Sequence, residues 1–305
     1  GANNVGVGAS ALTNNTTGAG SVAVGYEALM AATTGGQQVA VGYRALKSTT
    51  TSNDNVAVGY EALEANTSGK NVAVGWNAIK ADAGAVYCTA VGYDALAHQT
   101  GTRSHNTAVG NRAMLGVVVA NNNTAVGSEC MYTNTGGAQN TAVGKAALYT
   151  NSTGSNNTAV GYNALYANTT GEHNTAVGRQ ASASVTTGSQ NGAFGYYAMD
   201  DLTTGHQNNA FGRGALGSIT TQSSNTAMGD YALQANTAAE NSAFGYRALY
   251  SNTSGTAVTA VGKNALYANT TGDHNTGLGY SAGDSITTGS YNTAVGGAAL
   301  ATNST

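Results

Sequence analysis

A glycine that closes the five-residue motif Asn-Thr-Ala-Val-Gly, or a close variant of it, recurs along the whole chain of 305 residues. Of the seventeen intervals between these marker glycines, fourteen are 17 residues long, two are 16 and one is 18. Such self-similarity is the signature of a repeat protein, in which each repeat is a structural unit that stacks on its neighbours. The marker glycines are Gly8, Gly25, Gly42, Gly59, Gly75, Gly92, Gly110, Gly127, Gly144, Gly161, Gly178, Gly195, Gly212, Gly229, Gly245, Gly262, Gly279 and Gly296.

The composition separates a folded repeat from two rival explanations. The chain has 43 glycines and no proline, and its glycines do not recur every third residue, so a collagen triple helix is excluded. Only 8% of the residues are charged. Disordered chains usually carry more charge and lack regularly spaced Val, Leu and Tyr. The spacing therefore favours an ordered stack of coils over disorder.

The residues before each marker glycine indicate a strand with two different faces. Two residues before the glycine stands an alanine, here called the strand alanine, which only Gly6 and Gly277 replace. Directly before the glycine stands an apolar residue, here called the strand valine, although Phe, Met and Leu also occur there. Neighbouring side chains of a strand point to opposite faces. We predict that the strand valine fills the coil interior and that the strand alanine meets a closely packed surface outside it.

The residues after each marker glycine complete the predicted coil. An alanine and then a leucine, here called the corner leucine, follow at the third and fourth positions and supply a second core residue. Charged residues fall outside the motif and the Ala-Leu pair, so we expect their segments to face water. An Asn-Thr-Thr-Gly segment predicts a turn in which the Asn oxygen bonds its own backbone and the glycine takes a positive φ.

The fold class follows from these elements. A marker glycine and a turn in every coil leave no room for a helix of three turns. We predict an all-β protein, a parallel β-solenoid or β-roll of 18 coils of about 17 residues, each built as strand, bend, short strand and turn. Because the face of strand alanines is uniformly small, we also predict a homo-oligomer with its closest inter-chain packing at Ala125, Ala142, Ala159 and Ala176.

Several repeats resemble those of a known family. The segments Ser21-Val22-Ala23-Val24-Gly25, Asn55-Val56-Ala57-Val58-Gly59 and Asn71-Val72-Ala73-Val74-Gly75 are similar to the head repeats of trimeric autotransporter adhesins (YadA-like). The longer unit with Ala-Leu and Asn-Thr-Thr-Gly resembles repeats of phage tail fibres and bacterial surface proteins. The resemblance covers the whole chain and implies a homotrimeric fibre that is extracellular, on a cell surface or on a virion. It also implies that Ala159 lies near the inter-chain contact and Val160 inside each roll.

The two ends of the sequence continue the repeat. Asn303-Ser304-Thr305 followed by Gly1-Ala2-Asn3-Asn4 reproduces the pattern of residues 151–157. We therefore expect residues 1–305 to form a single repeat array that is uncapped at both ends. Such an array is either a window of a longer fibre or a protomer that stacks end to end.

Other functional classes find no support in the sequence. A net charge of −3 without a basic patch argues against nucleic-acid binding, and no apolar run approaches the roughly 18 residues of a membrane span. Apart from the adjacent Asp200 and Asp201, the acidic residues are scattered singly, so we expect no enzyme and no cofactor. Cys88 and Cys130 form neither a metal motif nor a disulfide framework. His105, His173 and His274 share one turn position with Gln, Ser and Tyr, so we expect solvent-facing turns rather than a metal site.

Aromatic residues recur in rows and keep two functions open. Tyr26, Tyr43, Tyr60, Trp76 and Tyr93 follow consecutive marker glycines, and Tyr132, Tyr149 and Tyr166 form a second row. Such rows stack along a sheet and cover its core, or they bind sugars on a cell surface. The sequence predicts a structural fibre shaft, a rigid spacer for attachment of the adhesin type. The alternative is a carbohydrate-binding fibre that recognises surface glycans through the exposed Tyr and Trp row.

Overall fold

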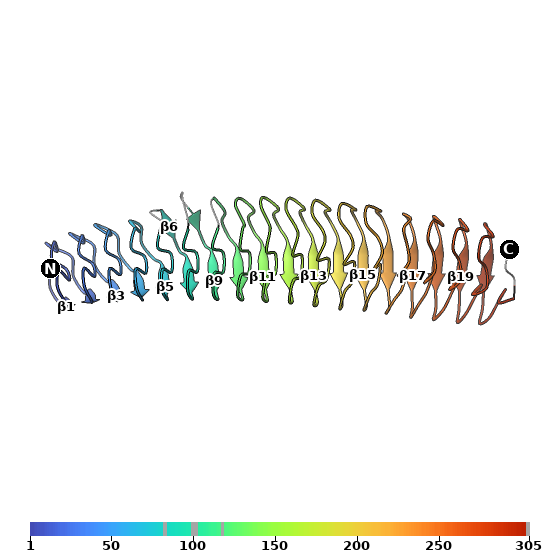
Figure 1. Ribbon diagram of the computed structural model, residues 1–305, viewed down its shortest axis with the longest axis horizontal. Helices are drawn as coiled ribbons and strands as arrows, with labels where there is room; N and C mark the ends of the chain where they lie inside the picture. Colours follow the sequence, from blue (N-terminus) through green and yellow to red (C-terminus); the bar gives the residue numbers. More distant parts are fainter. Residues whose placement is uncertain (82–83, 99–102, 117–118, 303–305) are drawn as a thin grey trace. The chain divides into compact units, whose positions relative to one another are not determined.

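A computed structural model describes residues 1–81, 84–98, 103–116 and 119–302, with the side chain of Arg103 excepted. The last predicted turn, at residues 303–305, lies outside these ranges. The chain divides into two compact units, Gly1–Asn156 and Asn157–Thr305. Throughout the described ranges the regular structure consists of β-strands and turns, without any helix. In each unit the strands follow one another in chain order (Figure 1).

The first unit contains one three-residue strand per coil. These strands pair in parallel and in chain order, so that each strand alanine lies beside the strand alanine of the next coil. A separate two-stranded sheet pairs β6 with β8. The strands are β1 (Val5–Val7), β2 (Val22–Val24), β3 (Val39–Val41), β4 (Val56–Val58), β5 (Val72–Val74), β6 (Ala85–Val86), β7 (Thr89–Val91), β8 (Arg103–Ser104), β9 (Thr107–Val109), β10 (Thr124–Val126) and β11 (Thr141–Val143).

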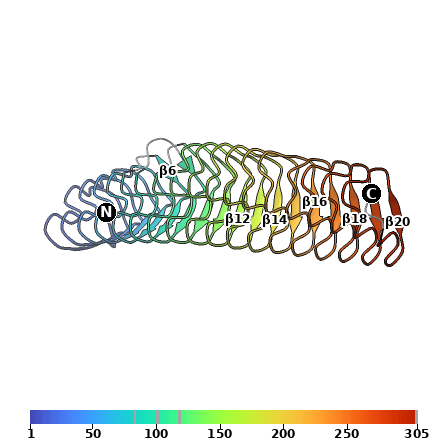
Figure 2. The same ribbon diagram turned by 45° about the vertical axis from the view of Figure 1, so that its right-hand side comes forward.

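The second unit repeats the same architecture. Its nine strands are again parallel and in register. Figure 2 shows one loop of chain between consecutive strands, which confirms the predicted parallel β-solenoid in each unit. The strands are β12 (Thr158–Val160), β13 (Thr175–Val177), β14 (Gly192–Phe194), β15 (Asn209–Phe211), β16 (Thr226–Met228), β17 (Ser242–Phe244), β18 (Thr259–Val261), β19 (Thr276–Leu278) and β20 (Thr293–Val295).

The two faces of the strand are the reverse of the prediction. The strand alanines point into the coil, where Ala57 and Ala176 are 0% exposed, while the strand valine Val58 is 37% exposed. The corner leucines share this interior and are equally buried, for example Leu63 and Leu165. Each coil therefore has a core of two alanines and one leucine, with the strand valine outside.

The narrowness of the coil explains this reversal. At Gly277, where the strand alanine is missing, an added Cβ would lie only 2.8 Å from Cγ of the corner leucine Leu266. At Gly6 the same added atom would be 3.7 Å from Cδ1 of Leu12, an ordinary van der Waals contact. A methyl group has room at Gly6 but would crowd Leu266 at Gly277, and a larger side chain would overlap the leucine at either position. The close packing predicted at the strand alanine is real, but a corner leucine of the same chain supplies it, from the same coil at Gly6 and from the preceding coil at Gly277.

A series of left-handed residues replaces the predicted second short strand. In the coil of β12, Gly161 has a φ of 133°, Asn163 of 54° and Leu165 of 49°. The same alternation recurs in coil after coil, so a buried leucine repeatedly adopts a conformation that costs an L-residue roughly 1–2 kcal/mol. Burial of the leucine side chain offsets that cost by about 1.5–3 kcal/mol.

In most coils a buried asparagine four residues before the marker glycine, here called the ladder asparagine, holds the coil closed. Oδ1 of Asn157 accepts a hydrogen bond from the backbone N–H of Asn174 in the next coil at 2.9 Å. Nδ2 of Asn174 donates to the carbonyl of Gly188 at 2.8 Å, across its own coil. The amide therefore satisfies backbone groups that would otherwise be buried without partners. The sequence motif contained this residue, but its polar character gave no sign of complete burial.

The turn glycine is required for a different reason from the one predicted. Gly171 does not adopt a positive φ, but a Cβ added there would lie 2.2 Å from the carbonyl oxygen of Gly188 in the next coil. The backbones of adjacent coils therefore touch at this point. The predicted Asn-to-backbone bond is present, since the N–H of Gly137 donates to Oδ1 of Asn134 at 3.0 Å. Asn134 is nevertheless buried rather than solvent-facing.

Candidate interaction surface

The outer face of each sheet carries a continuous row of apolar side chains, here called the valine stripe. It consists of the strand valines, which alternate with the buried strand alanines and leave the coil at its surface. The other strand valines are half-buried. Exposed members are Val7, Val24, Val58, Val74, Val91, Val126 and Val143 in the first unit, and Phe211, Met228, Phe244, Leu278 and Val295 in the second.

The valine stripe becomes bulkier within the second unit. Phe194 and Phe211 stack with ring centroids 4.5 Å apart and planes at 5° to each other. Met228 and Phe244 continue the row and are themselves exposed. Each of these residues stands at the same position in its own coil. The stripe therefore has one side chain per coil, here called a rung, with about 4.8 Å between rungs.

An open stripe of this kind is unusual for a parallel sheet. Parallel sheets are normally covered on both faces, and contiguous exposed apolar patches mark interaction sites. The interior side of these sheets is covered by the corner leucines, whereas nothing in the described chain covers the outer side. The valine stripe is therefore the surface most in need of a partner.

The four alanines predicted at an inter-chain contact do not lie on this surface. Ala125 and Ala142 of the first unit and Ala159 and Ala176 of the second are 0% exposed inside their own coils. No surface of these side chains is left for a second chain to touch. The position of any inter-chain contact stays a prediction, and these alanines offer no exposed side-chain surface to it.

The first unit contains the predicted aromatic row. Ring centroids are 5.4 Å apart for Tyr26 and Tyr43, 5.0 Å for Tyr43 and Tyr60, and 4.0 Å for Tyr60 and Trp76, all nearly parallel. Tyr93 occupies the next rung and is exposed, as are Tyr26 and Trp76. The expected stacking along the sheet is thus confirmed for the first four rings. Binding of a glycan by the row stays a prediction.

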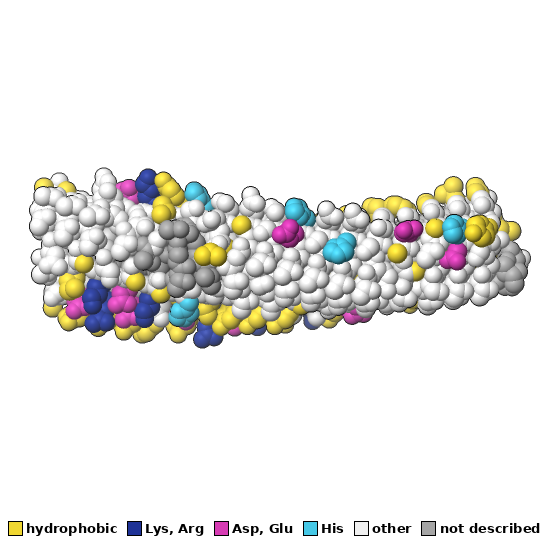
Figure 3. Space-filling view, turned by 90° about the horizontal axis from the view of Figure 1, so that it is seen from above, with side chains coloured by type: hydrophobic (Ala, Val, Ile, Leu, Met, Phe, Trp, Pro, Cys, Tyr) yellow, Lys and Arg dark blue, Asp and Glu magenta, His cyan; other side chains and the backbone are white. Residues whose placement is uncertain are grey.

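A ladder of alternating charges borders this aromatic row (Figure 3, dark blue and magenta side chains at the left). Glu27, Arg44 and Glu61 occupy the same position in consecutive coils, and Nε of Arg44 lies 2.9 Å from Oε2 of Glu27. Nζ of Lys47 contacts the same oxygen at 2.9 Å. Hydrogen bonds from Lys47 and then Arg44 lower the pKa of Glu27, while its bond to Tyr26 raises the pKa of that phenol.

The charge ladder was missed at the sequence level, although a signal existed. Opposite signs one coil apart at a fixed position predict ion pairs between rungs, as they do across paired strands. Glu61 departs most from expectation, because it is only 7% exposed and pairs with Lys80 rather than facing water. The guanidinium of Arg44 also lies 4.9 Å from the ring centroid of Tyr43, so the charges and the aromatic row form one surface.

The second tyrosine row and two of the histidines singled out in the sequence pack against neighbouring rings. Tyr132 and Tyr149 stack at 5.0 Å in the first unit, and Tyr166 belongs to the second unit. His105 stacks on Tyr87 at 5.0 Å and His274 on Tyr291 at 4.9 Å. Across the described ranges no three His, Cys, Asp or Glu side chains converge as metal ligands, and no helix has the length and apolar character to cross a membrane.

Comparison with known proteins adds no family to this description. No protein-family model matches the chain, and no curated protein matches it in sequence. The interpretation of the surface therefore rests on the geometry of the coils.

Both cysteines are buried free thiols, and this gives a direct test of coil integrity. Burial raises the pKa of Cys130 to about 12, and its Sγ lies 3.2 Å from the carbonyl oxygen of Ala142. Because thiolates rather than thiols react, we expect a colorimetric disulfide reagent at pH 8 to label neither cysteine in the folded protein. The same reagent in denaturant should label both. Rapid labelling of Cys130 in the native protein would contradict the buried position.

Proposed function

We propose that the protein is a structural fibre shaft in which copies of the same chain pack through their valine stripes. The carrying observation is the exposed apolar row, such as Val58, Val74 and Val91, on the outer face of an otherwise complete solenoid. Burial of apolar surface drives association, at about 25 cal/mol per Å² removed from water. A long row of small contributions can therefore hold chains together firmly.

The repeat spacing of the valine stripe argues for a copy of this chain as its partner. The stripe presents one apolar side chain per rung over many consecutive rungs. Only a partner with the same rung spacing can follow it without losing register, and another copy has that spacing by construction. Symmetric homo-oligomers are the usual result when a surface is complementary to itself. We propose three copies, as the resemblance to the trimeric adhesin heads implies.

The rest of the proposal follows from the in-register coils. Backbone ladders join the coils, and most coils are also joined by ladder asparagines such as Asn157 and Asn174, which favours a stiff spacer over a flexible linker. Only 8% of the residues are charged and the net charge is −3, which is consistent with a passive shaft that carries no strong electrostatic field. We place such a shaft outside the cell, on a cell surface or on a virion, with attachment as its purpose.

Substitution within the valine stripe tests the proposed assembly. We expect the triple variant Val58→Thr, Val74→Thr and Val91→Thr to weaken the oligomer, because threonine keeps the branched shape but exposes a hydroxyl to the contact. The comparison variant is Val39→Thr, Val56→Thr and Val72→Thr in the neighbouring row of the same outer face, where threonine already stands in β7, β9 and β10 and a smaller effect is expected. Native mass by sedimentation equilibrium, with circular dichroism as a fold check, gives the answer. Equal masses for both variants and the wild type would contradict the role of the stripe.

Carbohydrate binding is the second candidate function, and the exposed row from Tyr26 to Trp76 favours it. The stacked rings present their edges to solvent, and a ring at an end of the stack, such as Trp76, has one face that no other ring of the stack covers. A glycan array probed with the protein and with its Trp76→Ala variant distinguishes the two functions. Binding that the variant loses would support recognition of surface glycans, whereas signals at background would leave the shaft alone.

A further inference from the structure

One coil of the second unit lacks two side chains that its neighbours have. In the coil of β15 the second and fifth residues after the marker glycine are Gly214 and Gly217. At the second position the flanking coils carry Tyr197 and Tyr231, and at the fifth position they carry Asp200 and Gln234. Two adjacent rows of side chains are therefore interrupted at the same rung.

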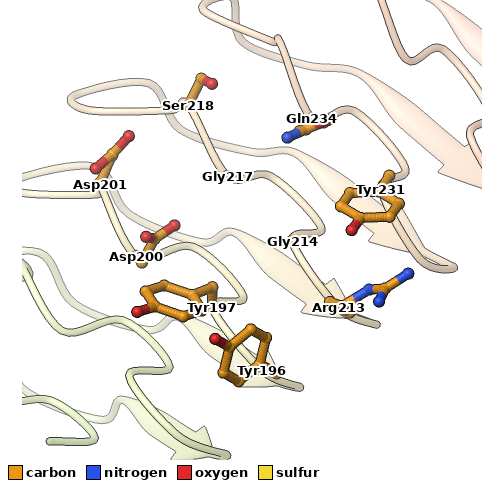
Figure 4. A pocket seen from close by; sticks show the side chains of 10 residues that line it. All are labelled: Tyr196, Tyr197, Asp200, Asp201, Arg213, Gly214, Gly217, Ser218, Tyr231 and Gln234. Atoms are coloured by element: carbon orange, nitrogen blue, oxygen red, sulfur yellow. The ribbon is translucent and has the colours of Figure 1, made fainter.

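The interruption opens a cavity of about 300 Å³ in the surface of the second unit. Figure 4 shows Tyr197 and Tyr231 on either side of Gly214, with Asp200, Asp201 and Gln234 around the same opening. We call this cavity the glycine slot. Ligand pockets in proteins begin at roughly this volume, so the glycine slot has room for a single small ring.

The rung spacing determines which ring shapes the glycine slot can hold. Side chains two rungs apart are separated by about 10 Å, twice the roughly 4.8 Å between strands. Elsewhere in the protein, rings on adjacent rungs stack at 4.0 to 5.4 Å. One ring inserted at the level of Gly214 would thus occupy the vacant rung between Tyr197 and Tyr231. The ring of Tyr231 leans into part of that rung, since a Cβ added to Gly214 would lie 3.0 Å from its Cδ1, so the side chain must turn aside when a ligand ring enters.

The polar groups of the glycine slot are mainly hydrogen-bond acceptors. Asp200 and Asp201 make no ion pair with any described side chain, and Gln234 adds an amide. Partial burial, and then the neighbouring charge of Asp201, raise the pKa of Asp200 to about 6. A ligand that donates hydrogen bonds to these carboxylates would relieve the incomplete solvation of Asp200. The guanidinium of Arg213 lies 4.6 Å from the ring centroid of Tyr231 and limits the attraction of the slot for a cation.

We propose that the glycine slot binds one pyranose ring of a neutral saccharide. The C–H face of a pyranose packs on the tyrosine rings, and its hydroxyls donate to Asp200 and Asp201 and exchange hydrogen bonds with Gln234. An aromatic hydrocarbon ring has no donors for the two carboxylates, and an anionic ligand would be repelled by them. The site is independent of the valine stripe and of the row that begins at Tyr26.

Saccharide binding to the intact protein can be measured directly. The probes are the methyl glycosides of glucose, galactose, mannose and N-acetylglucosamine, each followed by saturation-transfer NMR and by titration. We expect at least one of them to bind with a dissociation constant on the order of 1 mM, as is usual for a ligand of one ring. Absence of transfer to all four would overturn the proposal.

Filling the vacant rung provides the decisive variant. Gly214→Tyr restores the interrupted row, and tyrosine tolerates the conformation, because Tyr197 and Tyr231 have φ values of 53° and 60° at this position against 61° for Gly214. Asn163→Tyr is the matched control, at the same coil position with a φ of 54° but away from the slot. We expect Gly214→Tyr to weaken binding at least tenfold and Asn163→Tyr to leave it unchanged.

A second variant keeps the test valid if Gly214→Tyr folds poorly. Asp200→Asn preserves the shape of the slot and removes one acceptor charge, and we expect it to weaken binding about fivefold or more. Equal affinity of the wild type, Gly214→Tyr and Asp200→Asn would place the saccharide elsewhere and overturn the proposal. The native mass of the same samples reports separately on the fibre assembly, so the two proposals can fail independently.

Discussion

Ala176→Leu is expected to lower the stability of the second unit by about 1–3 kcal/mol, although both residues are apolar. Ala176 is fully buried and lies beside Ala159 and Ala193 of the adjacent coils. Three additional carbon atoms would have to fit into an interior that already holds Ser182 at the corner position and the fully buried Val185, and overpacking of a filled core typically costs about 1–3 kcal/mol. Because coils share their interior with both neighbours, strain at one rung should spread to the next. Urea unfolding followed by circular dichroism measures the loss.

The neighbouring residue supplies the control for this prediction. Val177→Leu changes the outer side of the same strand, where Val177 is only half-buried and Leu278 already occupies the equivalent position in β19. We expect its unfolding midpoint to stay close to that of the wild type. If Val177→Leu were the more damaging substitution, Val177 rather than Ala176 would have to face the interior of the coil.

Gly178→Ala should be more damaging still, although it adds a single methyl group. Gly178 has a φ of 139°, and an added Cβ would lie 2.4 Å from the carbonyl oxygen of Gly195 in the next coil. The obstacle is backbone that is itself held in the ladder, so neither coil can move without breaking hydrogen bonds to its neighbours. We expect a loss of more than about 3 kcal/mol, a size that only clashes and comparable defects produce. The midpoint of thermal or urea unfolding reports it.

Gly20→Ala separates the cost of the clash from the cost of the conformation. Gly20 also has a positive φ, of 72°, but an added Cβ there would meet only Cγ of Gln37 at 3.9 Å. We expect a loss of about 1 kcal/mol from the left-handed conformation alone. Similar losses at Gly20 and Gly178 would show that close approach between coils does not limit the marker glycine.

The repeat period, the parallel solenoid and the buried corner leucine could be predicted from the sequence because each leaves a regular trace in it. The side of the strand that faces inward could not. Alternation states only that Ala176 and Val177 point in opposite directions, and hydrophobicity favours valine for the interior. The available volume decides instead, and that volume depends on where the corner leucine of the assembled coil lies.

The asparagines illustrate a second limit of sequence reasoning. Asn157 and Asn174 are polar residues next to a turn, so their polarity suggests that they are exposed to solvent. Their burial follows from the hydrogen bonds that each makes to the backbone of its own coil and of the next one. Such bonds become visible only once the coils are stacked.

Of the two candidate binding surfaces, the sequence predicts one and not the other. The aromatic row at Tyr26, Tyr43 and Tyr60 could be predicted from spacing alone, because consecutive coils place equal positions side by side. The glycine slot could not, because Gly214 and Gly217 are unremarkable in so glycine-rich a chain. They gain meaning only between Tyr197 and Tyr231 on the neighbouring rungs.

Sedimentation equilibrium of the wild-type chain at micromolar concentration tests most directly whether the valine stripe is covered by copies of the same chain. The chain has a mass of 30.2 kDa. The proposed assembly predicts a single species of about three times that mass, which shifts toward smaller species when Val58, Val74 and Val91 are replaced by threonine. A stable species of 30.2 kDa would contradict it, because the apolar row would then remain open to water.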